Sequence, residues 1–505
     1  MTPKDISISK TKEAQLKSND AVKKETKEQQ YTFTNWAGNQ RACPAQIFHP
    51  QTANELVDIV HLANVEGKKI RCTAFGCTWS SSSVVNEEGY LVNITKMNRI
   101  FDPVHVEGNG WTVEIEAGVA VKDLDDALRK HEPPLALTSS VVLNSISFGG
   151  IISLGCHGAA SHESTMSDLV TKVKIIDASG VMNTFSKAAD PHEFSAAAVS
   201  LGLLGITYSY TIRVEPMFKL RMRDSSPPLV YYFGSPKTCG PRLKAMVLGN
   251  DQTEIFYWPF HANGKGMEYE RIWLKEWQRT SLPCSGSRTE AKIKKWAENI
   301  GMKLGNTIYR VMLQRPSIAP LVIRTLYKAI NMNKERVLYA PDAIHYQSGI
   351  EHVQSVCTEM GIKADENFEN VIHAWNKVIE LIEVYQRKGS FPLNIAVEMR
   401  FVKASQMLMS NLYDTDPNAI YAAIEIITAS DTSDFEHFAT EISQYWMDNF
   451  KAQPHWAKLW EFLPGIVPYL RREAGERYDQ FEAIRKKYDP QGIFMNRTFA
   501  GLVGH

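Results

Sequence analysis

Between residues 32 and 218 the chain alternates short strand-like stretches with short amphipathic stretches, and this alternation constrains its fold most strongly. Residues 52–66 place Leu56, Ile59, Val60 and Ala63 on one helical face, with Thr52 as a helix cap. Strand patterns occur at residues 68–74, 90–94, 111–118, 169–180 and 206–216, and a short helix is expected at 122–131. Short strands interspersed with short helices predict a mixed α+β domain of roughly 180 residues.

The first 31 residues have a different character. They consist mainly of Lys, Glu, Ser, Thr and Gln and contain almost no large apolar side chains. Such a segment cannot bury enough surface to offset the entropy of ordering it. We therefore expect a disordered polar tail at residues 1–31, with a solubilising role.

Beyond residue 218 the pattern becomes richer in helix. A strand-like stretch at 254–260 leads into a long helix-rich region, in which Gly389 ends an amphipathic helix at 365–388. The apolar side chains of that helix recur every three or four residues: Phe368, Val371, Ile372, Trp375, Val378, Ile379, Ile382 and Tyr385. A strand at 391–401 and further helices after Trp446 complete a second mixed α/β domain, expected at 219–470.

Composition excludes several classes of protein. Lys plus Arg and Asp plus Glu both number 56, so the zero net charge gives no general reason to expect a nucleic-acid partner. The seven cysteines are scattered and include no C-x-x-C pair, which favours neither a disulfide framework nor a zinc site. No apolar run approaches the ~18 residues of a membrane helix, and neither end reads as a targeting signal. We expect a cytoplasmic protein without an integral membrane segment, and leave peripheral membrane association open.

Common nucleotide-binding and hydrolase motifs are missing. The sequence has no G-x-G-x-x-G after a strand, no G-x-x-x-x-G-K-[ST], no H-E-x-x-H and no G-x-S-x-G. Two loops rich in small residues remain, at Ala74–Ser83 and Ser147–Ala160. Backbone N–H groups in such loops can approach an anion closely, so the pair could hold a pyrophosphate from both sides. Taken singly, each loop is more typical of a tight turn than of an anion site.

Several motifs occur together in an order typical of one family. The run NWAGNQRACPAQIFHPQTANELVDIVHLANVEGKKIR at 35–71 is followed by VNITKMNRI, VEIEAGVAVKDL, FGGIISLGCHGA and LGLLGIT, and later by IFYWPF, AVEMR, HWAK and YDPQGIFMN. This order resembles the aldonolactone oxidoreductases, within the vanillyl-alcohol-oxidase (PCMH-type) flavoprotein superfamily. The likeness is continuous over residues 34–218 and continues in separate stretches to the C-terminus.

The resemblance implies that the protein uses FAD to oxidise or reduce a small molecule and has no nucleic-acid partner. It implies a two-lobed PCMH-type FAD-binding domain at 32–218, a substrate or cap domain at 219–470, and a C-terminal segment at 471–505 that returns to the FAD domain. FAD would contact the 74–80 loop, the 149–158 segment and the start of the 206–216 strand. The residues implied to hold the cofactor are Ala74, Phe75, Gly76, Cys77, Thr78, Ser80, Gly149, Gly150, Ser153, Gly155, Cys156, His157, Gly158 and Ile206.

One position departs from the family pattern. Many oxidases of this group carry a His in a G-x-G-H-S loop that is covalently joined to the flavin, whereas the matching loop here has Cys77. We therefore expect non-covalent FAD, with a cysteinyl link through Cys77 as the alternative. No metal ion is expected.

Three residues are candidates for the chemistry. Glu398 and Arg400 are two apart on a strand, so both side chains point to one face, either as a surface ion pair or toward a substrate. The family's Glu-x-Arg pair favours the second interpretation, with Arg400 stabilising a developing alkoxide and Glu398 holding the proton. Lys458, in PHWAK, resembles a family Lys that would stabilise negative charge on reduced flavin. His157 and His455 are weaker candidates, and His157 fits a structural role better than proton transfer.

The leading hypothesis is an FAD-dependent oxidoreductase that oxidises a CH–OH carbon of a sugar-1,4-lactone or related polyol. O2 is the expected electron acceptor, which would give H2O2, with another acceptor left open. A specialised-metabolite alcohol is the alternative substrate. The rival from a different class is a flavin-binding protein without turnover, which the combination of Glu398, Arg400 and Lys458 argues against.

Overall fold

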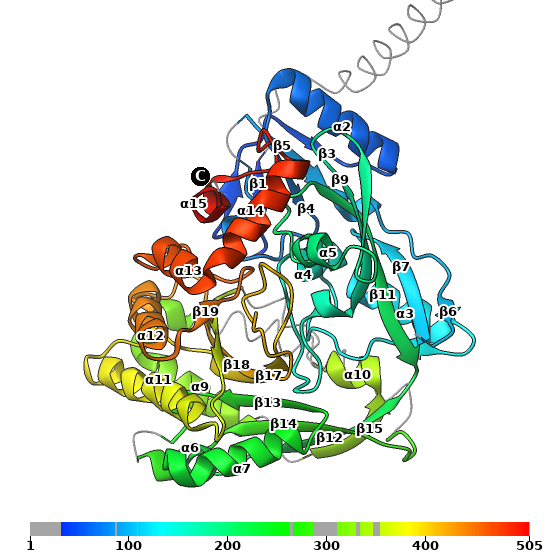
Figure 1. Ribbon diagram of the computed structural model, residues 1–505. Helices are drawn as coiled ribbons and strands as arrows, with labels where there is room; N and C mark the ends of the chain where they lie inside the picture. Colours follow the sequence, from blue (N-terminus) through cyan, green and yellow to red (C-terminus); the bar gives the residue numbers. More distant parts are fainter. Residues whose placement is uncertain are drawn as a thin grey trace, which may run out of the picture.

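A computed structural model describes residues 32–85, 88–108, 110–262, 266–285, 311–329, 334–346 and 354–503. The predicted polar tail at 1–31 lies outside these residues. The described chain forms two parts, each built around its own β-sheet structure (Figure 1). The predicted mixed α and β architecture is confirmed.

The first part combines a small parallel sheet with a larger antiparallel one. The parallel sheet has the order β3-β5-β4, and the six-stranded sheet has the order β10-β9-β11-β7-β6 with β8 paired to β11. The strands of the whole first part are β1 (Phe33–Thr34), β2 (Arg41–Ala42), β3 (Gln46–Phe48), β4 (Ile70–Thr73), β5 (Tyr90–Asn93), β6 (Val104–Val106), β7 (Gly110–Glu116), β8 (Leu135–Ala136), β9 (Val170–Ile176), β10 (Met182–Ser186) and β11 (Ile206–Pro216). Its helices are α2 (Ala53–Glu66), α3 (Val121–Lys130), α4 (Phe148–Ser153) and α5 (Pro191–Ala198).

Helix α2 forms where the sequence predicts it. The Thr52 hydroxyl accepts the N–H of Glu55, which caps the first turn, and Gly67 ends the helix with a φ of 64°. Leu56, Val60 and Ala63 are fully buried. The interval Ser147–Ala160 differs from expectation, because it contains helix α4, capped by the Ser147 hydroxyl, where the sequence suggested only a loop.

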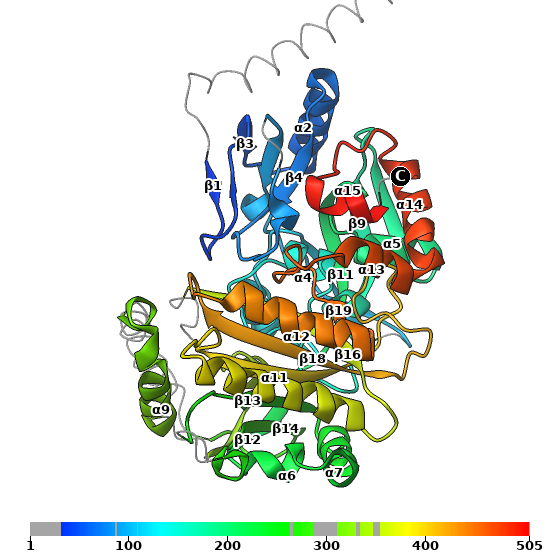
Figure 2. The same ribbon diagram turned by 90° about the vertical axis from the view of Figure 1, so that its left-hand side faces the viewer.

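The second part is an eight-stranded antiparallel sheet with the order β15-β12-β14-β13-β17-β18-β16-β19. Its strands are β12 (Lys219–Ser225), β13 (Gln252–Tyr257), β14 (Trp273–Arg279), β15 (Lys334–Tyr339), β16 (Ser355–Lys363), β17 (Ala396–Lys403), β18 (Ile420–Ala429) and β19 (Gln453–Pro454). The helices of this region are α6 (Leu229–Phe233), α7 (Pro236–Leu248), α9 (Ala319–Ala329), α10 (Ala340–Ile344), α11 (Glu369–Arg387) and α12 (Phe435–Phe450). Helices α11 and α12 lie along one face of the sheet (Figure 2).

Sequence patterns predicted fewer strands in this second part than the structure contains. Strands β16 and β18 are buried at nearly every residue, because α11 and α12 cover one face and the first part of the chain covers the other. Burial on both faces removes the apolar-polar alternation that identifies a strand. The region described above as helix-rich therefore holds most of a sheet, although its residues 286–310 lie outside the described chain.

The C-terminal helices α13 (Ile466–Ala474), α14 (Glu476–Tyr488) and α15 (Arg497–Val503) lead back toward the first part (Figure 1). The N–H of Ile70 in β4 donates to the carbonyl of Ile493 at 2.7 Å, and the N–H of Ala178 donates to that of Tyr488 at 3.0 Å. These contacts tie the end of the chain to β4 and to the turn that follows β9. The limits 32–218, 219–470 and 471–505 stay a prediction.

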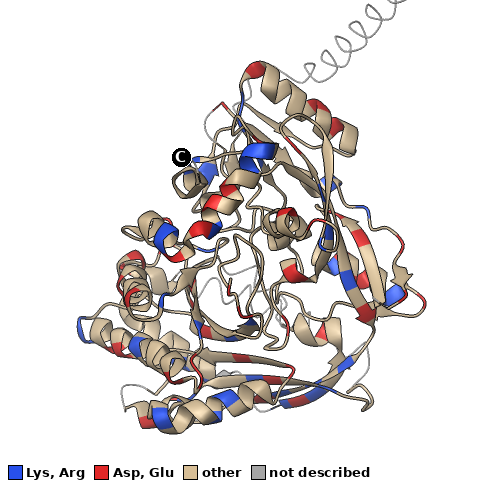
Figure 3. Cartoon of the chain, in the orientation of Figure 1, with Lys and Arg blue, Asp and Glu red and all other residues tan. Residues whose placement is uncertain are grey.

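Charged residues of both signs are interspersed along the helices and strands of both parts (Figure 3). No helix among the described residues combines the length and apolar character needed to span a bilayer.

Candidate active site

A cavity of about 500 Å³ lies between the loops of the first part and the eight-stranded sheet of the second. Both small-residue loops reach it, together with the segment before β11 and residues of strands β16, β17 and β18. Of the residues predicted to hold the cofactor, those that line the cavity are Ala74, Phe75, Gly76, Cys77, Thr78, Gly149, Gly150, Ser153, Cys156 and His157. Glu398, Arg400 and Lys458 line it as well.

Four predicted cofactor residues stand behind the cavity wall. Ser80 is buried, and its N–H donates to the carbonyl of Ala457 at 3.3 Å. A Cβ on Gly158 would lie 2.6 Å from the Ser140 carbonyl oxygen, so this glycine allows two backbones to pack closely. Gly155 has a φ of 65°, and Ile206 lies in the core while its neighbours Gly205 and Thr207 line the cavity.

The wall formed by the second part carries a cluster of charges. Glu398 on β17 is paired in register with Glu425 on β18, and Glu425 is paired with Glu359 on β16, so the three carboxylates point to the same face. The Arg400 guanidinium Nη2 donates to Glu359 Oε2 at 3.0 Å and to Glu425 Oε2 at 2.9 Å. Its Nε lies 3.2 Å from Glu398 Oε1 without hydrogen-bond geometry.

Lys458 joins this cluster from the loop that follows β19. Its Nζ donates to Glu425 Oε1 at 2.6 Å, lies 3.8 Å from Glu359 Oε2, and stands 4.5 Å from the ring centroid of Trp79. Trp79 belongs to the first small-residue loop, and its indole N–H donates to the Ser355 carbonyl at 2.6 Å. The loop and the charged wall are therefore joined directly.

Burial changes the proton affinities of the cluster. Burial raises the pKa of Glu398 to about 8, with Arg400 opposing that rise. Although burial alone would raise it, the pKa of Glu359 is held well below its usual range by Arg400 and His157. Burial also opposes the charge of Arg400, yet the surrounding carboxylates raise its pKa. At neutral pH the cluster thus combines ionised Glu359 and charged Arg400 with a largely protonated Glu398.

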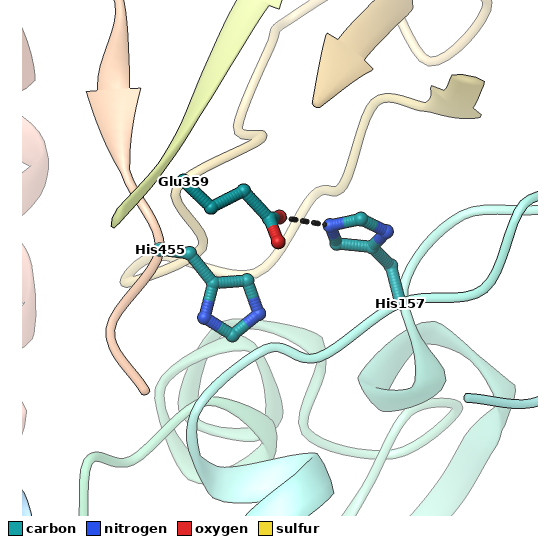
Figure 4. Close-up of side chains that lie close together, drawn as sticks. All are labelled: His157, Glu359 and His455. Atoms are coloured by element: carbon teal, nitrogen blue, oxygen red, sulfur yellow. Dashed lines mark hydrogen bonds and ion pairs between the residues drawn. The ribbon is translucent and has the colours of Figure 1, made fainter. Parts of the chain in front are cut away.

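His157, Glu359 and His455 meet at the edge of the cluster, with Glu359 between the two rings (Figure 4). His157 Nε2 lies 2.7 Å from Glu359 Oε1, and His157 Nδ1 donates to the Gly158 carbonyl at 2.9 Å. Both ring nitrogens of His157 therefore face hydrogen-bond acceptors.

The same three residues have ligand atoms within 4.8 Å of one another, the spacing of a metal site. His455 argues against that assignment, because its Nδ1 accepts the N–H of Ala457 at 3.1 Å and burial lowers its pKa to about 3, which leaves the proton on Nε2. The cations Arg400 and Lys458 beside Glu359 further oppose a metal ion. We assign the group as a hydrogen-bond network that holds Glu359 in place.

Glu359 and Glu425 were missed by sequence reasoning. Each is a lone charged residue inside an otherwise apolar stretch, SVCTEMGIK and IYAAIEIITA, and such a residue in a buried strand is the signal that could have identified them. Their relation to Arg400 depends on strand register, which no single segment of sequence reveals.

The cavity has the features that FAD would require. Its first-part wall includes Gly76, Gly149, Gly150, Gly202 and Gly205, where no side chain keeps a cofactor away from the main chain. Two buried polar atoms that lack a hydrogen-bond partner among the described residues, Thr73 Oγ1 and Arg400 Nε, belong to cavity-lining residues. Buried polar atoms normally have partners, so these two are suited to a bound molecule.

Comparisons with known proteins agree with this chemistry. A family model described as an FAD binding domain matches residues 44–186, and one described as D-arabinono-1,4-lactone oxidase matches residues 210–501. L-gulono-1,4-lactone dehydrogenase from Mycobacterium tuberculosis is 24% identical over 478 residues, covering 94% of this chain and 99% of that protein. D-arabinono-1,4-lactone oxidase from Candida glabrata is 26% identical over 538 residues, covering 94% and 97%.

Among solved structures, cholesterol oxidase from B. sterolicum superposes with a TM-score of 0.78 at 21% identity, covering 94% of this chain and 97% of that one. This likeness shows a common fold. The oxidase family model, by contrast, spans more than half of the sequence and includes Glu398, Arg400 and Lys458. The chain is therefore an FAD-dependent oxidoreductase that belongs to the D-arabinono-1,4-lactone oxidase family.

Proposed function

We propose that this protein oxidises a CH–OH carbon of a sugar-1,4-lactone, with O2 as the final electron acceptor and H2O2 as the second product. Bound FAD supplies the hydride acceptor, N5 of the isoalloxazine. The observation that carries the proposal is the Glu398–Arg400 pair, which lies buried in the wall of the same cavity that the two small-residue loops enter.

Arg400 and Glu398 divide the work on the substrate hydroxyl. Arg400 Nε–H lies 3.2 Å from Glu398 Oε1 but makes no hydrogen bond with any described residue, so it can donate to the substrate oxygen that develops negative charge. The deprotonated Glu398 carboxylate accepts the hydroxyl proton as hydride leaves the carbon. Lys458 adds positive charge beside Trp79, on the side of the first loop.

The charges of the wall favour a neutral substrate. Arg400 is bound by Glu359 and Glu425, and Lys458 is bound by Glu425. A free sugar acid would bring another carboxylate toward carboxylates whose cations are already paired, which is unfavourable in a buried site. A lactone carries no such charge, and this difference supports the ring-closed substrate over its hydrolysed acid.

The residues that would hold FAD without a covalent bond are those of the 73–78 loop and of α4 with its preceding turn. Thr73 offers an unpaired hydroxyl, and Gly149 and Gly150 present backbone to the cavity. Cys77 occupies the place of the family's linking His, which supports non-covalent binding.

The visible spectrum of the purified protein tests the cofactor, and acid precipitation tests its attachment. We expect a flavin spectrum and a colourless pellet with FAD in the supernatant; a yellow pellet would show a covalent bond. A panel of 1,4-lactones, their hydrolysed acids and simple alcohols, assayed for flavin bleaching and peroxide, tests the reaction. Bleaching by alcohols but not by lactones, or by none of the compounds, would refute the proposed substrate class.

A further inference from the structure

A row of alternating charges crosses the eight-stranded sheet, starting at the active site. Arg400 on β17 is paired in register with Glu254 on β13, Glu254 with Lys275 on β14, and Lys275 with Asp224 on β12. Residues paired in register on antiparallel strands point to the same face of a sheet. The four side chains therefore form one line of positive, negative, positive and negative groups.

This row is buried until it reaches the edge of the sheet. Glu254, Lys275 and Asp224 are 2%, 1% and 5% exposed. Lys275 Nζ donates to Asp224 Oδ1 at 2.6 Å, and Arg336, which is partly exposed, lies 3.7 Å from Asp224 Oδ2. Burying so many charges is costly, and it is tolerated only where each has compensating partners.

Glu254 is the member of the row next to Arg400. It accepts a hydrogen bond from the Tyr346 hydroxyl, and it stands in register between Arg400 and Lys275. Lys275 is already engaged by Asp224 and lies 3.9 Å from the Tyr346 ring centroid. The charge of Glu254 therefore acts mainly on Arg400 and, one position further along β17 on the same face, on Glu398.

We propose that Glu254 is a positioning residue for the oxidation. From the neighbouring strand, outside the cavity, its carboxylate attracts the Arg400 guanidinium, and its charge sets the pH at which Glu398 releases its proton. This inference rests on the proposed function of Glu398 as proton acceptor. Glu254 touches neither substrate nor cofactor, since it is absent from the cavity lining.

Two carboxylates on one face of a sheet repel each other when both are ionised. Glu254 and Glu398 are diagonal neighbours across β13 and β17, a relation that places residues roughly 7 Å apart. The pKa of Glu254 is raised by burial, as is that of Glu398. The other charged groups that act on Glu398 are Arg400, Glu425 and Lys458, and Glu359 with its neighbours His157 and His455 adjoins Arg400 and Lys458. All of these remain in place when Glu254 alone is changed.

The test compares E254Q with wild type in the FAD-loaded enzyme. Neutralising Glu254 removes its repulsion of the Glu398 carboxylate, and Arg400 then attracts that carboxylate without competition from Glu254. The acid limb of the pH profile of kcat/KM should therefore move to lower pH by about one unit. The matched control is E276Q. Glu276 is next to Lys275 on β14 but points to the other face, where it accepts from the Asn250 amide at 3.0 Å. This control should leave the limb unchanged.

A second measurement does not require turnover. The infrared carboxyl band that disappears in E398Q identifies Glu398, and its pH titration should shift downward in E254Q but not in E276Q. Y346F removes a hydrogen bond to Glu254 without removing the carboxylate. It should shift the Glu398 titration in the same direction, but by a smaller amount.

Equal Glu398 titrations in wild type, E254Q and Y346F would overturn the inference, even if lactone oxidation is observed. A shifted band without any lactone oxidation would support the coupling and refute the proposed substrate instead. If E254Q does not fold, Y346F decides the matter, because an unchanged Glu398 band in that variant contradicts the role of Glu254.

Discussion

Arg400 is a buried guanidinium surrounded by carboxylates, each placed by a different strand. Glu398, Glu425 and Glu359 stand on β17, β18 and β16, and together they raise the pKa of Arg400 against the effect of burial. A cation held in this way keeps its orientation before substrate binds, which is the condition for effective stabilisation of a developing oxyanion.

Replacing Arg400 by Ala should therefore reduce kcat/KM by about 100-fold or more, a loss of roughly 3 kcal/mol of transition-state stabilisation. Steady-state kinetics on the best lactone of the panel measures this loss. R400K keeps the charge but not the forked geometry, and should recover only part of the activity. Unchanged turnover in R400A would show that another group polarises the substrate oxygen.

Glu398 must be deprotonated to accept a proton, and burial raises its pKa to about 8. A base with a raised pKa is inactive below it, so kcat/KM should rise about tenfold per pH unit up to pH 8 and level off above. The profile measured between pH 6 and 10 checks this expectation. E398Q should lose most activity and show no such limb; a limb that persists in E398Q would assign it to another residue.

Two adjacent glycines in α4 illustrate how one element serves both packing and binding. A Cβ on Gly149 would lie 2.8 Å from the Ala117 carbonyl oxygen, whereas a Cβ on Gly150 would meet only the Ser147 hydroxyl, at 3.7 Å. Both line the cavity. Gly149 allows α4 to pack closely against the backbone at the end of β7, whereas a side chain at Gly150 would meet no backbone.

G149A should destabilise the protein by about 1–3 kcal/mol, because backbone must move to admit the methyl group. G150A should leave the free energy of unfolding unchanged or raise it by up to about 1 kcal/mol, because Ala favours a helix over Gly. Denaturant titration without FAD measures both. FAD titration of G150A then shows whether the cofactor approaches this residue, with weaker binding expected. Equal stability losses in the two variants would contradict the packing argument.

The elements of the first part were more predictable than those of the second. Helix α2 and strand β11 were expected at their observed places, because their periodicity and caps are local properties. Strands β14, β15, β16 and β18 escaped prediction. For β16 and β18 in particular, burial of both faces leaves no alternation to detect.

At the scale of the whole molecule, Arg71 links three distant segments. This buried side chain donates to the carbonyl oxygens of Ser82, Leu201, Gly202 and Phe494, with donor–acceptor distances of 2.5–3.1 Å. Burial lowers its pKa to about 10, so it remains charged at neutral pH. The first small-residue loop, the segment before β11 and the C-terminal segment are joined through it.

R71M should lower the free energy of unfolding by about 3 kcal/mol or more, because it leaves buried carbonyls without donors. It should also weaken FAD binding, since Arg71 and Ser82 both line the cavity. R387M, which removes a solvent-exposed pair with Glu383, is the control and should change stability by less than about 1 kcal/mol. Denaturant titrations and FAD titrations of both variants measure these effects. Similar stability for R71M and wild type would refute the linking role.

The local pattern of residues determined α2, β11, the two small-residue loops and the shared face of Glu398 and Arg400, because caps and periodicity act over a few positions. The order of the motifs also pointed to the family and its cofactor. Only the tertiary structure placed Glu359, Glu425 and Glu254 around Arg400. Those contacts arise from the register of strands up to about 150 residues apart, and register is set by how whole sheets pack.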